Sequence, residues 1–293
     1  MNDDLGDRMK DYEGKTEVRL MPMLPTFARV DGRAFHSFTR GMNRPYDVRM
    51  STAMTETAKW LAKETNARMV YTQSDEITLA WLSTDRKSQI WFDGRHSKMV
   101  SQIAALATLT FYRACVEIMP EYAEKLPSFD ARVWQVPNIA EGANVFLWRE
   151  WDATKNSISM AAHSVYSDKQ LHGKNGSDKQ EMLFQKGINW NDYPAFFKRG
   201  TYIQRRSVVR PFTTEEMDKL PPKHKARTNP GLTVERSEWR VLELPPLGQI
   251  VNREAVIFEG AEPENRVELN SSNNKVSDGV SRSDHRLVSF LIL

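Results

Sequence analysis

The sequence predicts an α+β fold in which helices cover a mainly antiparallel sheet. A strand-like apolar run covers residues 26–30. Two runs rich in β-branched and aromatic residues, 68–71 and 77–82, are separated by a short polar break, which predicts a β-hairpin. Apolar residues at helical spacing occupy 47–61 and 97–118. A strand, a helix, a hairpin and another helix in this order are typical of a helix layer packed on an antiparallel sheet.

The two helices have recognisable boundaries. The first is predicted to begin at Asp47, whose carboxylate is able to accept hydrogen bonds from free N–H groups of the first turn. Its apolar face is formed by Met50, Ala53, Met54, Thr57, Ala58 and Leu61. The second ends before Pro120, because proline cannot continue a helix. Cys115 falls in the apolar pattern of this helix, and we interpret this single cysteine as a core residue.

Later segments give weaker signals. Residues 129–136 alternate in polarity and predict another strand of the sheet, and a helical stretch is expected to begin at residue 144. The polar segment 169–179 is expected to be a flexible loop, whereas Thr213 and two following glutamates predict a helix that ends at the prolines 221–222. Two further expectations concern the end of the chain. Residues 270–284 read as a disordered connector, and residues 287–293 as an edge strand, an oligomer contact or a tail.

Composition indicates a globular protein. The chain has 293 residues, of which 40% are hydrophobic, and this is enough for a sizeable core. No apolar stretch of about 20 residues suggests a membrane span. The first residues are acidic where a signal peptide would be basic, so we expect a cytoplasmic location and no membrane association.

The net charge of +3 permits nucleic-acid binding without requiring it. Basic residues gather late in the chain, and aromatic residues accompany them. The basic residues are Lys198, Arg199, Arg205, Arg206, Arg210, Lys223, Lys225 and Arg227, and the aromatic ones are Trp190, Tyr193, Phe196, Phe197 and Tyr202. Interleaved cations and rings suit single-stranded RNA ends. Ordinary solvated cations on helices and strands are an equally good interpretation.

Two carboxylates occupy positions where strands end. Asp31 follows the first strand-like run, and Asp75 lies in the polar break of the hairpin. If these strands are neighbours, the two side chains are able to share two Mg2+ ions roughly 3.5 to 4 Å apart. Plain turn chemistry is the alternative, because Asp-Gly and Ser-Asp are common turn residues.

Three ordered motifs resemble the tRNA-His guanylyltransferase family of 3′-to-5′ nucleotide-adding polymerases. They are Asp31-Gly32-Arg33-x-Phe35-His36, Arg44-Pro45-x-Asp47 and Gln73-Ser74-Asp75-Glu76. The likeness extends over most of the chain and weakens after about residue 263. It implies a polymerase-palm or nucleotide-cyclase-like antiparallel sheet backed by helices, with a helical and basic C-terminal part. Residues 1–136 would be the catalytic palm, 137–263 a part that contacts RNA and triphosphate, and 264–293 a polar connector and tail.

The resemblance also implies roles for residues. Asp31, the Gly32 carbonyl and Asp75 would hold two Mg2+ ions. Glu76 would orient a metal-bound water or pair with a neighbouring cation. The nucleotide-binding set would be Asp31, Gly32, Arg33, Ala34, Phe35, His36, Asp47, Ser74, Asp75, Arg95 and Lys98, with Asp47 at the base and Arg95 and Lys98 on the triphosphate. Asn156, Lys179, Lys198 and Arg199 would contact RNA or a second triphosphate. His36 is equally well interpreted as a hydrogen-bonded core residue.

One motif departs from the eukaryotic members. Where they carry His-Ile-Asn-Asn-Leu-Tyr-Asn, this chain has Thr154-Lys155-Asn156-Ser157-Ile158-Ser159-Met160 and so lacks the histidine. This pattern is similar to the bacterial and viral branch, which implies template-dependent addition of nucleotides to the 5′ end of truncated tRNA after activation by ATP or GTP. Three alternatives stay open: untemplated guanosine addition to tRNA-His, a cyclase-like activity without RNA, and a tRNA-binding module with a dead site. The resemblance further implies a homotetramer.

Overall fold

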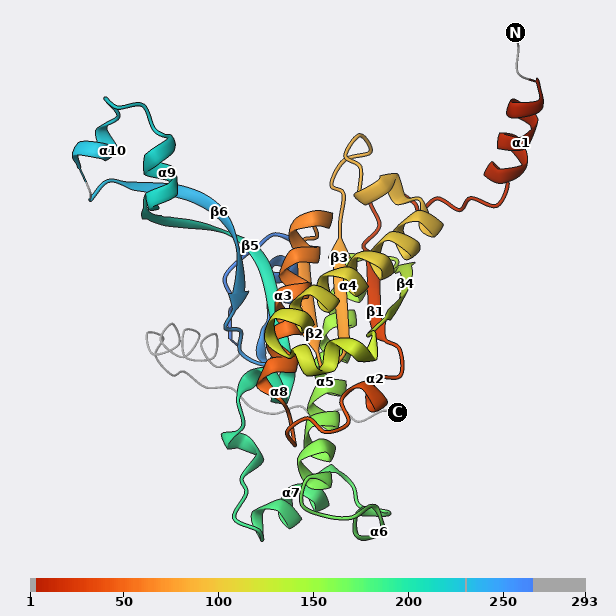
Figure 1. Ribbon diagram of the computed structural model, residues 1–293, viewed down its shortest axis with the longest axis vertical. Helices are drawn as coiled ribbons and strands as arrows, with labels where there is room; N and C mark the ends of the chain where they lie inside the picture. Colours follow the sequence, from red (N-terminus) through yellow and green to blue (C-terminus); the bar gives the residue numbers. More distant parts are fainter. Residues whose placement is uncertain (1–3, 230, 266–293) are drawn as a thin grey trace, which may run out of the picture.

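A computed structural model describes residues 4–229 and 231–265 (Figure 1). The segments 270–284 and 287–293, which carried the two expectations about the end of the chain, lie outside these residues.

The centre of the molecule is a six-stranded antiparallel sheet with the order β4-β1-β3-β2-β5-β6. The strands are β1 (Thr26–Gly32), β2 (Met69–Gln73), β3 (Glu76–Trp81), β4 (Phe129–Gln135), β5 (Thr201–Pro211) and β6 (Thr233–Leu242). The α+β prediction is therefore confirmed, as are the predicted strands up to residue 136. Residues beyond 137 add β5 and β6 to the same sheet. The proposed division into 1–136 and 137–263 stays a prediction.

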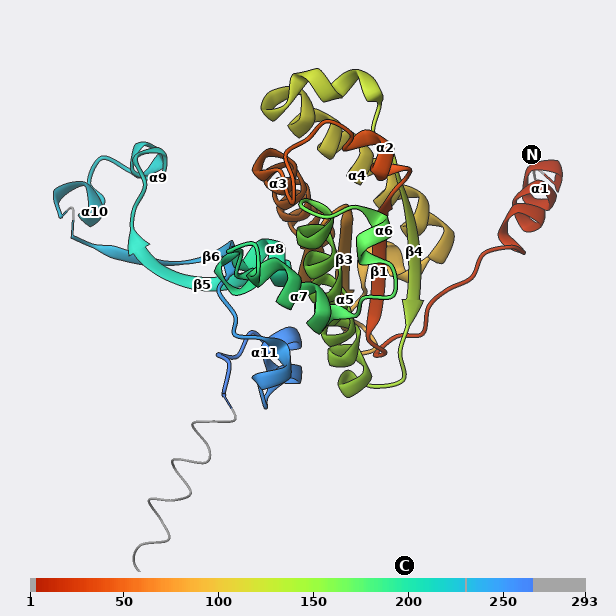
Figure 2. The same ribbon diagram turned by 90° about the horizontal axis from the view of Figure 1, so that it is seen from below.

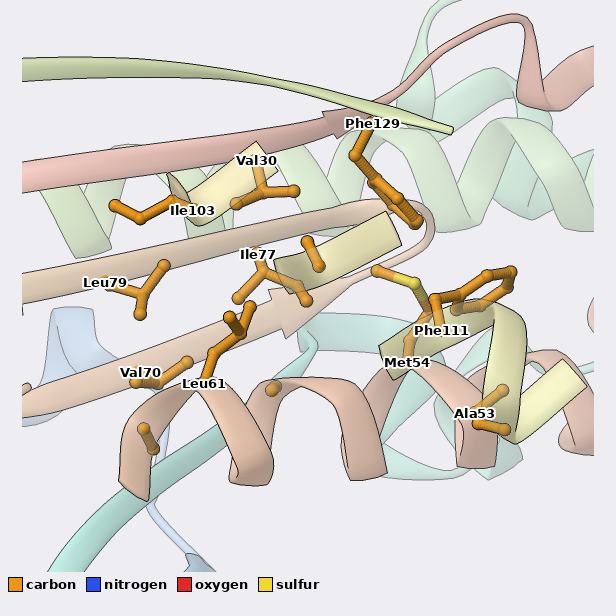
Figure 3. Close-up of a cluster of buried hydrophobic side chains, with 14 of the residues drawn as sticks. Val30, Ala53, Met54, Leu61, Val70, Ile77, Leu79, Ile103, Phe111 and Phe129 are labelled. Carbon is orange, nitrogen blue, oxygen red and sulfur yellow. The ribbon is translucent and has the colours of Figure 1, made fainter. Parts of the chain in front are cut away.

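One face of the sheet is covered by α3 (Val48–Thr65) and α4 (His96–Ile118), whose starts agree with the sequence to within a residue. Apolar residues of both helices and of alternate strand positions form a core that Figure 3 shows from within, with Val30, Leu61 and Phe111 among its members. Cys115 is buried there, as predicted. By length and composition α4 is also able to cross a membrane, which is weak evidence because a core helix has the same character.

The other face is covered by α5 (Ile139–His163) and α11 (Arg253–Phe258). Phe27, Tyr71 and Phe146 lie in the second core, between this layer and the sheet. The helix begins five residues before the predicted position 144. The reason is Asn138, whose side chain accepts a hydrogen bond from the N–H of Glu141 and so caps the helix.

The prediction of a flexible loop at 169–179 is wrong, because this segment contributes to two helices, α6 (Asp168–Leu171) and α7 (Gly176–Phe184). Asn175 and Asp178 form a reciprocal capping box, each side chain accepting the other's backbone N–H at 3.0 Å. The polar residues that suggested flexibility are therefore the helix start signal. Gly173, with φ of 73°, makes the turn between the helices.

Strands β5 and β6 form a long hairpin that projects from the body and ends in α9 (Thr214–Lys219) and α10 (Lys225–Thr228) (Figure 1). The capping box of Thr213 and Glu216 confirms the predicted helix start. Arg210 pairs with Glu216 at 2.7 Å and with Glu238 at 2.5 Å. Cross-strand ion pairs therefore neutralise part of the basic cluster that suggested RNA binding. The ring of Tyr202 is fully buried, so it offers no stacking surface.

The helix α1 (Asp4–Gly14) buries no residue and stands apart from the body in both views (Figures 1 and 2). The remaining short helices connect the main elements. They are α2 (Phe35–Phe38), α8 (Ala195–Arg199), η1 (Trp91–Gly94), η2 (Pro120–Lys125), η3 (Trp190–Asp192) and η4 (Leu247–Gln249).

Candidate active site

The structure brings the two predicted carboxylates together. Strand β1 pairs with β3 so that Asp31 is opposite Glu76. The N–H of Gly32 donates a hydrogen bond to the carbonyl of Asp75 at 3.1 Å. The strands that carry Asp31 and Asp75 are therefore neighbours, which the predicted sharing of metal ions requires. Because side chains alternate along a strand, Asp31 points to the same face of the sheet as Phe27, the face covered by α5.

Asp75 lies near two other carboxylates, those of Asp31 and Glu76. Burial raises the pKa of its carboxyl group, and the nearby carboxylates of Asp31 and Glu76 raise it further. The hydroxyl of Ser74 donates to Asp75 at 3.0 Å and opposes the shift only in part. Ser74 holds the turn in a left-handed conformation with φ of 50°. A cation between Asp31 and Asp75 would offset this repulsion.

Glu76 is held by Arg149, a residue that the sequence-based site did not include. Arg149 on α5 is almost fully buried and donates a short hydrogen bond to Glu76. It also lies 3.2 Å from Asp152. Of the two roles predicted for Glu76, pairing with a neighbouring cation is the one the geometry shows. A signal existed in the sequence, because Arg149 and Asp152 are three residues apart and form an ion pair on one helix face.

The turn after β1 is shaped for a close approach of the backbone. A Cβ atom on Gly32 would lie 2.4 Å from the ring of Phe35, so only glycine fits there. Ala34 is in the left-handed region with φ of 55°. Within the part of the chain that the structure describes, the N–H groups of Ala34, Phe35 and His36 have no partner. These three groups are available to an anion.

Two predicted members of this turn differ from expectation in detail. The N–H of Arg33 donates to the carbonyl of Ser128 at 2.9 Å, so it is not available to an anion as the next three N–H groups are. The side chain of Arg33 is exposed. His36 is exposed and its Nε2 lies 3.0 Å from the hydroxyl of Ser37. The core interpretation of His36 is therefore wrong.

Asp47 caps α3, as predicted. Its carboxylate accepts hydrogen bonds from the N–H groups of Asn43 and Arg49 and pairs with the Arg49 guanidinium at 2.8 Å. The hydrogen bond from Arg49 lowers the pKa of Asp47 to about 2. The carboxylate is buried and fully used within the fold, and its predicted contact with a base stays a prediction.

Replacing Asp47 with alanine is expected to lower the free energy of unfolding by about 1–2 kcal/mol, the usual effect of losing a helix cap. Because the folded pKa is depressed, this stabilisation is complete above the ordinary value of 3.8 and is lost as the pH falls towards about 2. Urea unfolding at pH 7 and at acid pH measures it. An alanine variant as stable as the parent at pH 7 would contradict the capping role.

Polar residues continue along α5 away from the carboxylates. The amide of Asn156 donates to Asp152 at 3.4 Å, and the ammonium of Lys179 on α7 donates to the Ser159 hydroxyl at 3.0 Å. Arg149, Asp152, Asn156 and Ser159 are spaced three or four residues apart and so share one face of the helix. The structure thus connects the predicted residues Asn156 and Lys179 to the carboxylate end through one polar strip.

Lys198 and Arg199 lie on α8 and are half-buried. The Lys198 ammonium donates to the carbonyl of Asn191 and lies 5.5 Å from the ring centroid of Trp190. The carbonyl of Arg199 accepts a hydrogen bond from the Tyr71 hydroxyl at 2.8 Å. Both residues therefore help to join α8 to its neighbours, and their predicted RNA contact stays a prediction.

Arg95 and Lys98 are not brought to the carboxylates within this chain. They lie at the start of α4, where His96 contacts the carbonyl of Val133, three strand positions from the Asp130 that faces Asp31. Arg95 pairs with Glu17, and Lys98 lies over the ring of Phe92 at 4.7 Å. A pocket of about 850 Å3 at this opposite end of the sheet is lined in part by Arg95. The predicted triphosphate contact of these two residues stays a prediction.

No cluster of three or more His, Cys, Asp or Glu side chains arranged for a metal ion occurs in residues 4–229 and 231–265. The predicted ligands are instead two carboxylates and one backbone carbonyl. All are oxygen donors, the type that Mg2+ binds, and Mg2+ commonly keeps several waters with only one or two carboxylates. This donor set, on strand ends that the pairing of β1 with β3 brings together, fits such an ion.

The chain is similar in sequence and in structure to several known proteins. A family model for tRNAHis guanylyltransferase matches residues 6–137, which include Asp31 and Asp75. The tRNA(His) guanylyltransferase of Schizosaccharomyces pombe is 30% identical over 208 residues, covering 65% of this chain and 77% of that protein. A structure of a bacterial tRNA(His) guanylyltransferase-like protein with ATP is 36% identical with a TM-score of 0.70, covering 86% of this chain and 97% of that one. A structure of a bacterial protein of the same description with GTP is 33% identical with a TM-score of 0.65, covering 84% of this chain and 94% of that one.

Proposed function

Because this chain belongs to the tRNAHis guanylyltransferase family of nucleotidyltransferases, we propose that it adds nucleotides in the 3′-to-5′ direction to the 5′ end of truncated tRNA, with a template base selecting each nucleotide. The observation that carries this proposal is the contact of the Asp31–Gly32 strand end with Asp75. ATP or GTP would activate the 5′ end, and nucleoside triphosphates would be the donors. The complexes of the bacterial relative with ATP and GTP support these substrates.

Two Mg2+ ions would be held by the carboxylates of Asp31 and Asp75 and by the carbonyl of Gly32. When bound, they would lower the pKa of the attacking hydroxyl and neutralise charge on the reacting phosphate. The chain itself supplies anchoring groups. The free N–H groups of Ala34, Phe35 and His36 would bind phosphate oxygens, and Arg149 would keep the carboxylate of Glu76 in place.

The chemistry proposed here needs no protein nucleophile. The 3′-hydroxyl of the incoming nucleotide would attack the activated 5′ phosphate, and the activating nucleotide or pyrophosphate would leave. Positioning and charge neutralisation supply most of the rate enhancement in such reactions. A site of two carboxylates and free N–H groups is suited to this task.

Thr154 supports the template-dependent form of the activity. It replaces the histidine of the eukaryotic motif, and its hydroxyl donates to the carbonyl of Glu150 within its own helix at 2.9 Å. The hydroxyl proton is used within the helix, and the ring N–H donor of the eukaryotic histidine has no counterpart at this position. Watson-Crick pairing with the opposing base would then select the nucleotide.

The test compares the addition of each of the four nucleotides to truncated tRNAs that differ only in the base opposite the missing position. The expected result is that the added nucleotide changes with that base. Guanosine addition regardless of the base would favour the untemplated tRNA-His activity instead. A cyclic nucleotide formed from ATP or GTP without RNA would indicate a cyclase, and the absence of any addition would favour a binding module.

A homotetramer in the cytoplasm completes the proposal. The helix α1 exposes Leu5, Met9 and Tyr12, which are three or four residues apart and so form an exposed apolar stripe. Within the described residues, the Lys15 ammonium lies 5.5 Å from the centroid of the Tyr12 ring. The outer face of α4 exposes Leu109 and Tyr112. Apolar faces of this kind support contacts between copies of the chain.

A further inference from the structure

A groove on the outer face of α7 is not used by the site described above. It has a volume of about 320 Å3 and lies between α7 and the segment that leads into η3. Ser177, Gln180, Glu181 and Phe184 line it from one face of the helix, and Ile188 and Trp190 line it from the other side. The opposite face of α7 is directed to α5, because Lys179 bonds to Ser159 there.

The ring of Phe184 is 67% exposed, and within the described residues it makes no contact with another ring. Among the described residues, the side-chain amide of Gln180 on the same wall has no hydrogen-bond partner, while Glu181 accepts one hydrogen bond from the amide of Gln185 at 3.2 Å. Trp190 is fixed, since its indole N–H donates to the Ser157 hydroxyl at 3.2 Å. An exposed aromatic face, a fixed indole and an unused amide are the groups that bind a nucleobase by stacking and by its hydrogen-bonding edge.

The size and charge of the groove select among ligands. A volume of about 320 Å3 is near the lower limit for small-molecule pockets, which span roughly 300–1,000 Å3, so one planar base suits it better than a whole nucleoside triphosphate. Glu181 gives the wall a carboxylate, which accepts hydrogen bonds from base amino groups but repels phosphate. The ammonium of Lys198 lies 5.5 Å from the Trp190 ring centroid and donates to the carbonyl of Asn191, so it places a positive charge near this ring without lining the groove.

The groove lies at the carboxylate end of the molecule. Arg149 contacts Glu76 beside Asp31, and Ser157 contacts Trp190 beside the groove. Both residues are on α5, and their separation of eight positions corresponds to about 12 Å along the helix. Figure 1 shows α5 crossing one face of the sheet and extending past the ends of the strands to α7. About 12 Å is the length of roughly three or four stacked nucleotides.

We propose that this groove binds an unpaired nucleobase of the single-stranded 3′ tail that extends beyond the 5′ end of the substrate RNA. This proposal rests on the proposed function, because it requires the 5′ end to lie at Asp31 and Asp75. The base stacks on Phe184 and Trp190 while Gln180 and Glu181 bond to its edge. The groove thereby fixes the distance between the tail and the reacting 5′ phosphate.

The test measures binding of labelled acceptor-stem RNA with and without a four-nucleotide 3′ tail. Phe184→Ala removes an exposed ring and so should leave the fold unchanged, which circular dichroism checks. The dissociation constant for the tailed RNA is expected to rise roughly tenfold or more, as loss of one base stack predicts, while that for the blunt RNA stays unchanged. Abasic residues in the tail should produce the same loss with the unaltered protein.

Trp151→Ala on α5 is the matched control, because it removes an exposed ring that lies beside Gly248, on the side of the helix away from the polar strip, and should change neither constant. An equal loss of affinity for tailed and blunt RNA, or an unchanged affinity for tailed RNA with Phe184→Ala, would overturn the proposal that this groove binds a base. Nucleotide addition by the unaltered protein to a truncated tRNA is measured in parallel. If addition occurs while Phe184→Ala is without effect, the groove proposal fails alone; if no addition occurs, the proposed function fails.

Discussion

Replacing Asp75 with asparagine is expected to reduce nucleotide addition by roughly a thousandfold or more, and Asp31→Asn should do the same. Each change removes one negative charge from a donor set that has only two carboxylates, and several kcal/mol of transition-state stabilisation corresponds to rate losses of this size. For Asp75 the change also removes the acid whose pKa is raised by burial and by Asp31 and Glu76, so the fold should become no less stable. Single-turnover rates with a 5′-activated truncated tRNA measure the effect.

Asp85→Asn is the matched control, because Asp85 lies in the loop after β3 and accepts a hydrogen bond from the N–H of Lys87 at 2.9 Å, far from the paired strand ends. Its rate should equal that of the parent. A near-normal rate for Asp31→Asn or Asp75→Asn in Mg2+ would show that these carboxylates do not hold the ion. A substantial recovery of the Asp75→Asn rate at high Mg2+ would instead support weakened binding at this site.

Local signals and strand order were sufficient to predict where the two carboxylates lie, while their binding of metal stays a prediction. Asp31 and Asp75 could be predicted because each follows a strand with its own apolar pattern. The cap at Asp47 could be predicted because a capping residue acts on the turn next to it in the chain. Their adjacency, by contrast, depends on the antiparallel pairing of β1 with β3, which the sequence made plausible and the register Asp31 with Glu76 establishes.

Other features depend on contacts that no local pattern specifies. The arginines of the β5–β6 hairpin suggested an RNA surface, but Glu216 and Glu238 neutralise Arg210 across strands and turns. Polar residues at 169–179 suggested a loop, although Asn175 and Asp178 cap a helix whose apolar residue Leu183 is buried. The positions of Arg95 and Lys98 follow from the direction of α4 on the sheet, and local sequence does not determine that direction.

Replacing Arg149 with methionine is expected to lower the free energy of unfolding by about 3–5 kcal/mol, because Glu76 and Asp152 would lose their shared cation and Glu76 is mostly buried. Glu76→Gln should cost clearly less, since Arg149 keeps its pair with Asp152 at 3.2 Å. The two changes remove opposite ends of one ion pair. Their unequal cost is therefore a specific signature of the arrangement, and urea unfolding of both variants at pH 7 measures it.

The double variant Arg149→Met/Glu76→Gln separates the charge of the pair from its packing. If an unpaired Glu76 carboxylate causes most of the loss in Arg149→Met, the double variant should be more stable than that single variant, because no charge at Glu76 remains to be compensated. Equal instability of the two would mean that Arg149 acts through packing between α5 and the sheet. Since Glu76 is opposite Asp31 in the strand register, Arg149→Met should also reduce nucleotide addition under conditions where the variant stays folded.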